Sequence, residues 1–165
     1  MATFLSQVIN GLNQASILLI ATMGLVIIFG YMNVTNMAHG SMIMVGGVSA
    51  YVLMEVVGLP FGVAVAGSFL ITALIGMVIE KVIIKKLYSK PTETILATYA
   101  VSLILTELVR LKYPLSQNVH MPLPGAFRIG SVTIPYYNIF VGIFAILILL
   151  FTLFLFRKTT FGKKL

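Results

Sequence analysis

Two groups of uncharged polar side chains lie within an otherwise apolar sequence. The first falls within residues 30–51 and consists of Asn33, Asn36 and His39, with Gly40 directly after the histidine. The second is a series of hydroxyls that recur every four residues, namely Thr94, Thr98, Ser102 and Thr106. Amide and hydroxyl groups donate and accept hydrogen bonds without carrying a full charge. Both groups therefore have the chemistry to interact with a small neutral polar solute.

The same residues also have a purely structural explanation. Asn and His can bridge neighbouring membrane helices, and Gly46 with Ala50 forms a small-residue pair that lets helices pack closely. The hydroxyls can bond to the carbonyl one turn back and pack against a neighbour, which is the commoner role of such a stripe. For His39, hydrogen bonding outranks proton relay because no acidic residue lies near it in the sequence.

Enzymatic chemistry finds little support in the composition. The chain has no cysteine and no aspartate, and its four carboxylates belong to Glu55, Glu80, Glu93 and Glu107. Thiolate metal sites are excluded, and paired-carboxylate chemistry nearly so. Gly162-Lys163 lacks the upstream glycine of a phosphate-binding loop. The sequence therefore predicts no catalytic residue, no metal and no cofactor, and any ATP-driven step must depend on a partner.

The elements that position these residues are predicted to be membrane helices. The 165 residues are 59% hydrophobic and only 9% charged, outside the range of soluble domains. A bilayer core needs about 20 apolar residues per helix. Five runs fit, over Val8 to Gly30, Asn36 to Val57, Phe61 to Ile84, Thr92 to Leu111 and Tyr136 to Phe156. We predict an all-α integral membrane protein with about five transmembrane helices. The second is rich in glycine, which would allow the helix to be interrupted within the membrane.

The only sizeable loop is expected between the fourth and fifth helices. Its prolines, Pro114, Pro122, Pro124 and Pro135, prevent continuous helix. Within it, residues 127–129 and 132–134 flank Gly130-Ser131, which predicts a small extracytoplasmic hairpin with glycine first in a two-residue turn.

The basic residues are concentrated in two blocks. The blocks are Lys81, Lys85, Lys86 and Lys90, then Arg157, Lys158, Lys163 and Lys164. Lys and Arg concentrate in short cytoplasmic loops, and two predicted helices separate the blocks, so both can face the cytoplasm. This arrangement places the N-terminus outside. The net charge of +7 does not form the basic face with interleaved aromatics that a nucleic-acid groove needs, so no nucleic-acid partner is predicted.

Three stretches resemble the permease subunits of ABC importers for branched-chain amino acids and urea. They are GYMNVTNMAHGSMIMVGGVSAY (30–51), LYSKPTETILATYAVSLILTELVR (87–110) and RKTTFGKKL (157–165), in the family's order and spacing. Residues 36–40, 91–98 and 117–119 look closer to the urea branch. Ser41 departs from the pattern, since the family often has glutamate there.

The resemblance implies an importer subunit of a bacterial-type inner membrane that moves a small neutral solute, first of all urea, by alternating access. The implied partners are a second permease subunit, cytoplasmic ATP-binding subunits, an extracytoplasmic solute-binding protein and the lipid bilayer. Candidates for the translocation path are Asn33, Asn36, His39, Gly40, Thr94, Thr98 and Ser102. Candidates for the ATPase-coupling region are Arg157, Lys158, Thr160, Gly162 and Lys163.

Family permeases are considerably longer, so residues 1–165 are expected to form a single transmembrane permease domain, the N-terminal portion of such a protein. Other functions stay open at this point. The chain can be a branched-chain amino acid permease of the same family, or a passive channel or membrane scaffold. A secondary transporter should show a second broken segment, which the sequence lacks. Dependence of flux on a separate ATPase would distinguish an importer from a channel.

Overall fold

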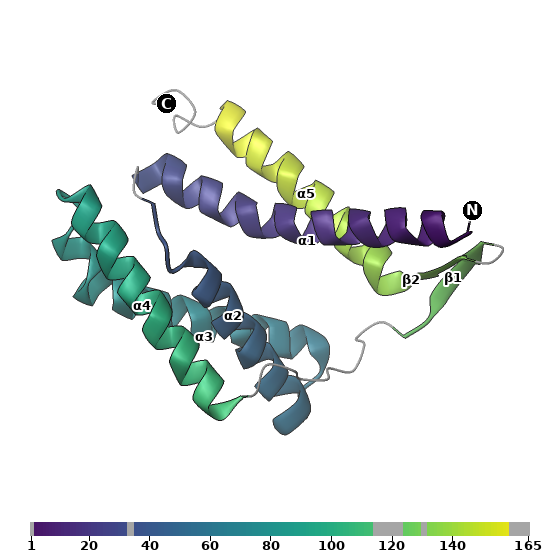
Figure 1. Ribbon diagram of the computed structural model, residues 1–165, viewed down its shortest axis with the longest axis horizontal. Coiled ribbons are helices and arrows are strands. Elements are labelled where there is room, and N and C mark those ends of the chain that lie inside the picture. The colour runs from purple at the N-terminus through teal and green to yellow at the C-terminus, as the bar shows by residue number, and fades with distance from the viewer. Residues whose placement is uncertain (1, 33–34, 114–123, 130–131, 159–165) are drawn as a thin grey trace. The chain divides into compact units, whose positions relative to one another are not determined.

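The computed structural model describes residues 2–32, 35–113, 124–129 and 132–158. Their elements, in chain order (Figure 1), are α1 (Ala2–Met32), α2 (His39–Tyr51), η1 (Val52–Val56), α3 (Phe61–Val82), η2 (Ile84–Lys86), α4 (Pro91–Lys112), β1 (Ala126–Ile129), β2 (Val132–Pro135) and α5 (Tyr136–Lys158). η1 is a π-helical turn and η2 a 3₁₀ turn.

Within the described residues, five helical segments are long and apolar enough to cross a membrane. They are Thr3–Gly30, His39–Val56, Phe61–Lys86, Pro91–Lys112 and Tyr136–Arg157. Large apolar side chains cover their outer surfaces, with Phe69 and Leu96 more than two-thirds exposed. Helices satisfy their own backbone hydrogen bonds and so can lie in lipid. The predicted all-helical, five-span architecture is confirmed, and the chain is a multi-pass membrane protein.

The first two helices depart most from their predicted bounds. α1 begins at Ala2 rather than Val8, because polar residues such as Ser6 and Gln7 continue the helix without extending the apolar run. α2 begins at His39 rather than Asn36, because the Asn36 side chain accepts a hydrogen bond from the backbone N–H two residues on. That local bond favours a turn over a helix.

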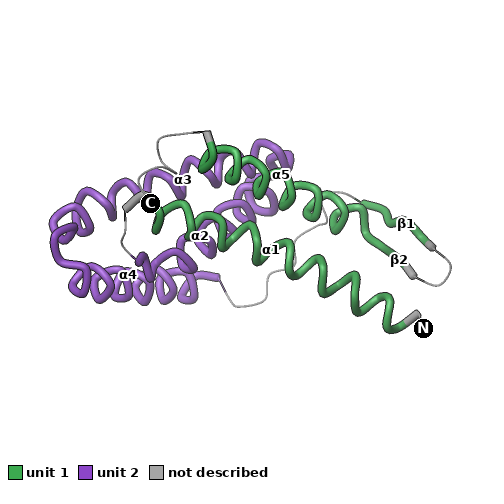
Figure 2. Tube along the Cα trace, turned by 90° about the horizontal axis from the view of Figure 1, so that it is seen from above, with its two compact units in different colours: residues 1–31, 121–165 green, residues 32–120 purple. Residues whose placement is uncertain are grey.

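The chain forms two compact units, shown in different colours in Figure 2. Residues 32–120 hold α2, η1, α3, η2 and α4, and residues 1–31 with 121–165 hold α1, the hairpin and α5.

In the unit of residues 32–120, α2 contacts both α3 and α4. Small residues allow this close approach. A Cβ on Gly46 would lie 3.4 Å from the Thr72 hydroxyl, and one on Gly76 would lie 3.4 Å from the Met42 methyl. The buried side chains of this unit are also small or medium-sized, namely Ala38, Ser41, Val45, Ala64, Ser68, Thr94, Thr98 and Val101.

The predicted hairpin is confirmed in the other unit. β1 and β2 pair antiparallel, with Phe127 opposite Ile134. Gly125 precedes β1 with a φ of 114°, a conformation that side chains disfavour, and its carbonyl accepts a hydrogen bond from the Tyr136 N–H at 3.2 Å. This bond ties the start of the hairpin to the start of α5. The two turn residues, 130 and 131, lie outside the described residues.

Candidate functional site

The start of α2 is held by hydrogen bonds from three successive backbone N–H groups. The Met37 N–H donates to the Thr98 hydroxyl at 3.1 Å, and the Ala38 N–H donates to the Asn36 side-chain oxygen at 2.9 Å. The His39 N–H donates to the Asn36 carbonyl at 3.3 Å. The first N–H groups of a helix have no partner within the helix. Here the chain leading into α2 obtains two acceptors from Asn36 in its own turn and one from Thr98 of α4.

Thr98 places the start of α2 well along α4. α4 begins at Pro91, and Thr98 lies two turns further, about 10 Å at 1.5 Å per residue. The non-helical residues 35–38 therefore lie beside the body of α4 and not at its end. In a membrane, non-helical backbone is tolerated where protein buries it or where it lines a cavity. Ala38 meets the first condition, being only 2% exposed.

Thr94 and Thr98 on α4 use their hydroxyls within the protein. Both side chains are fully buried, at 0% exposure. The Thr94 hydroxyl lies 2.7 Å from the Leu87 carbonyl and 3.0 Å from the Lys90 carbonyl, and the Thr98 hydroxyl donates to the Ile95 carbonyl at 3.0 Å. These contacts fix the entry to α4 and the α2–α4 interface, which is the packing role that the sequence left open for the stripe.

Ser102 differs from its neighbours in the stripe. It is half-buried, and within the described part of the chain its hydroxyl has no hydrogen-bond partner. Its carbonyl accepts a hydrogen bond from the Thr106 hydroxyl at 2.8 Å, so Thr106 is bonded within the helix. Ser102 is therefore the stripe residue whose hydroxyl no described residue engages.

Gly40 and His39 lie in the first turn of α2. Gly40 is exposed, and a Cβ added to it would meet nothing within 4 Å. His39 is half-buried. The open space at Gly40 leaves the backbone of this turn accessible from one side.

Several predicted site residues fall outside the described residues. Asn33 is one of them, and so are Thr160, Gly162 and Lys163 in the predicted coupling region. Arg157 is exposed in the last turn of α5, and Lys158 ends that helix. The coupling region stays a prediction.

The π-helical turn at the other end of α2 was not predicted. The Leu59 N–H donates to the Leu53 carbonyl at 2.9 Å across this turn, which also contains Glu55. The Leu53 side chain fills the space over Gly67 of α3, where a Cβ would lie only 2.7 Å from it. π-turns are often found at functional sites. The nearest signal in the sequence is Gly58, which indicates a chain reversal but no π-turn. In the structure its φ is 78°.

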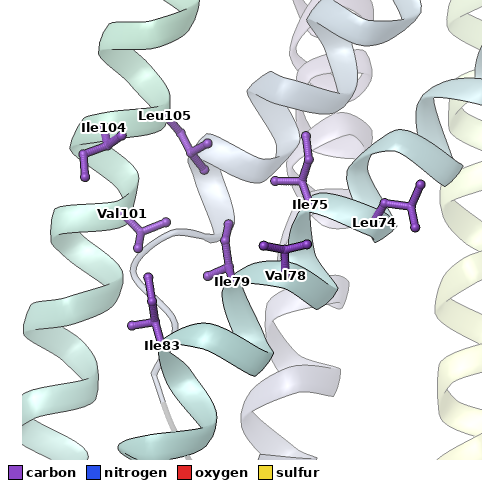
Figure 3. A pocket seen from close by; sticks show the side chains of 8 residues that line it. All are labelled: Leu74, Ile75, Val78, Ile79, Ile83, Val101, Ile104 and Leu105. Atoms are coloured by element: carbon purple, nitrogen blue, oxygen red, sulfur yellow. The ribbon is translucent and has the colours of Figure 1, made fainter.

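An apolar groove separates α3 from α4 in the same unit (Figure 3). It encloses about 390 Å³ and is lined by Leu74, Ile75, Val78, Ile79, Ile83, Val101, Ile104 and Leu105. Such a lining offers no hydrogen bonds to a polar solute, whose desolvation would be costly there. The groove is therefore chemically unlike the start of α2.

The comparison with protein families places the chain in a transport family. The family model described as branched-chain amino acid transport system, permease component, matches residues 7–165. No match was found among the curated proteins or the solved structures. Since the family match covers nearly the whole chain, this multi-pass membrane protein is a transporter subunit, and it belongs to the family of permease components of branched-chain amino acid transport systems.

Proposed function

We propose that the chain is the permease subunit of an ATP-binding-cassette importer for a small neutral solute, with urea as the first choice. The observation that carries this proposal is the hydrogen bond from Met37 to Thr98, which holds the start of α2 beside the body of α4. Gly40 and Ser102 then offer a backbone turn and a hydroxyl. Both are neutral, so urea can exchange hydrogen bonds with them without desolvating a charge.

A branched-chain amino acid is the second candidate, because the family's description names that substrate class. The N-terminus of α2 is able to bind a carboxylate through backbone N–H groups. An ammonium group would need a carboxylate partner as well. On α4, however, Glu93 and Glu107 are exposed and pair with Lys90 at 2.9 Å and Arg110 at 3.1 Å. This favours a solute without charge.

The proposed complex contains a second permease subunit, cytoplasmic ATP-binding subunits and an extracytoplasmic solute-binding protein. In it, residues 1–165 act as a single permease domain. Asn33, Asn36, His39, Gly40 and Ser102 lie along the path, while Thr94 and Thr98 hold its wall in place. Arg157, Lys158, Thr160, Gly162 and Lys163 lead toward the ATPase.

The orientation proposed for a bacterial-type inner membrane places both basic blocks in the cytoplasm and the N-terminus outside. A single cysteine at Gln117 tests this, because the chain has no cysteine of its own. An impermeant thiol reagent should label that cysteine from the outer side. Labelling from the cytoplasmic side alone would reverse the proposed arrangement.

Uptake by the complete complex in proteoliposomes tests the function. Labelled urea and labelled leucine are offered with and without ATP. Urea should accumulate only with ATP, and excess urea should compete with any leucine uptake. Urea flux that is equal without ATP would indicate a passive channel, and leucine uptake untouched by excess urea would refute the urea assignment.

A matched pair of variants tests the path itself. Ser102→Ala removes a hydroxyl that has no partner among the described residues, and should raise the KM for urea severalfold. Ser68→Ala removes a buried hydroxyl that donates to the Val65 carbonyl at 2.9 Å within α3, and should leave the KM unchanged. Equal kinetics for the two variants would remove Ser102 from the path.

A further inference from the structure

The apolar groove between α3 and α4 ends beside the basic turn that joins these helices. Ile83, which lines the groove, is the residue directly before η2, and η2 contains Lys85 and Lys86. Consecutive Cα atoms are about 3.8 Å apart, so these two lysines lie at most about 8 and 11 Å from Ile83 along the chain. The apolar groove and the two lysines of η2 are therefore next to each other.

The two η2 lysines are available to an outside anion. Both are exposed, and among the described residues neither forms an ion pair. The nearby carboxylates have other partners, since Glu93 pairs with Lys90 at 2.9 Å and Glu80 accepts a hydrogen bond from the Tyr88 hydroxyl at 3.0 Å. The turn therefore has uncompensated positive charge.

The groove has a volume of about 390 Å³, and its lining contains no polar side chain. A flexible hydrocarbon chain fits such a space, and the side chains around it, such as Ile79 and Leu105 in Figure 3, offer only apolar contact.

We infer that this groove and the η2 lysines form a binding site for one anionic phospholipid. An acyl chain occupies the groove, and the phosphate of the headgroup lies at Lys85 and Lys86. Basic pockets between membrane helices are suited to anionic headgroups, each lysine near the surface contributing about fivefold in affinity. The groove adds shape selection for an acyl chain rather than a hydrophobic gain, since lipid tails are as apolar as its lining. The two halves of the site therefore recognise different parts of one lipid.

Lipid titration of the complete transporter, followed by native mass spectrometry, tests this inference. The probes are phosphatidylglycerol and phosphatidylcholine with the same acyl chains, together with inorganic phosphate. Phosphatidylglycerol should bind at least tenfold more tightly than phosphatidylcholine, and inorganic phosphate should not compete at equal concentration. Equal affinity for both lipids would show that the lysines do not bind the headgroup. Full competition by phosphate would show that the groove does not bind an acyl chain.

Matched variants separate the headgroup from the acyl chain. Lys85→Gln with Lys86→Gln should weaken phosphatidylglycerol binding at least tenfold, and the Arg replacements of both should retain it. Arg128→Gln with Lys112→Gln removes the same charge elsewhere and should have no effect. Ile79→Phe should fill the groove and weaken the binding of both lipids. Val82→Phe lies on the same helix but outside the groove, and should weaken the binding of neither lipid.

Two results would overturn the site whatever the variants' stability. One is unchanged phosphatidylglycerol affinity in both the lysine and the groove-filling variants. The other is efficient cross-linking of a cysteine at Val78 to another subunit in the assembled transporter, which would show that protein covers the groove.

Discussion

The two faces of α4 differ in how they contact neighbouring helices. Toward α2, Thr94 and Thr98 are fully buried, and the Thr98 hydroxyl accepts the Met37 N–H. Toward α3, Val101 and Ile104 border an apolar groove that the protein leaves unfilled. Lipid tails are as apolar as these side chains, so burying the side chains against α3 adds little stability. Small residues and hydrogen bonds, in contrast, do favour helix association. Polar contacts therefore set the positions of these helices.

The largest effect is expected where the polar contact is broken. Thr98→Val leaves the partly buried Met37 N–H without its acceptor, and an unsatisfied donor inside a protein costs about 1 to 3 kcal/mol. Thermal or denaturant unfolding of the purified protein in detergent should show that loss. Thr98→Ser keeps the hydroxyl and serves as the control. If the valine variant proved as stable as the serine variant, the contact would contribute nothing to stability.

A smaller loss of stability is expected where α2 continues into η1 and contacts α3. Gly67→Ala places a methyl 2.7 Å from the Leu53 side chain, which must change position. Overpacking of this kind costs about 1 kcal/mol or slightly more. Gly47→Ala is the control, because a Cβ there meets nothing within 4 Å, and it should be neutral or stabilising. Equal stability of both variants in the same unfolding assay would argue against close α2–α3 packing.

The smallest effect is expected on the apolar side of α4. Ile104→Ala shortens a side chain on the rim of the groove that is 59% exposed. Exposed substitutions usually change stability by less than about 0.5 kcal/mol, so its unfolding in lipid-free detergent should match that of the parent protein. A loss as large as that of Thr98→Val would mean that the apolar face, and not the polar one, determines the packing.

The parts of the fold that depend on local pattern could be predicted from the sequence. Apolar runs located the spans, and Gly130-Ser131 between β-branched residues indicated the hairpin. Asn36 was selected for its amide, but its role in ending the non-helical turn depends on the bond to Ala38 and has no periodic signature.

The parts that depend on how helices meet could not be predicted. The spacing of Thr94, Thr98 and Ser102 identified one face of a helix. It could not separate the two buried threonines from Ser102, because that difference arises where the start of α2 contacts α4. The groove likewise depends on the distance between α3 and α4, which the contacts of α2 with both helices influence.

The central claim is that the first turn of α2 lies on an aqueous path used by the solute. The most direct test introduces Gly40→Cys into the complete transporter in membranes and measures its reaction with a charged, membrane-impermeant thiol reagent. We expect the cysteine to react and urea to slow the reaction, while Leu96→Cys, which replaces a side chain 72% exposed on the apolar surface of α4, stays unreactive in lipid. A cysteine at position 40 that is as unreactive as the one at 96, or that reacts at a rate urea does not change, would contradict the claim.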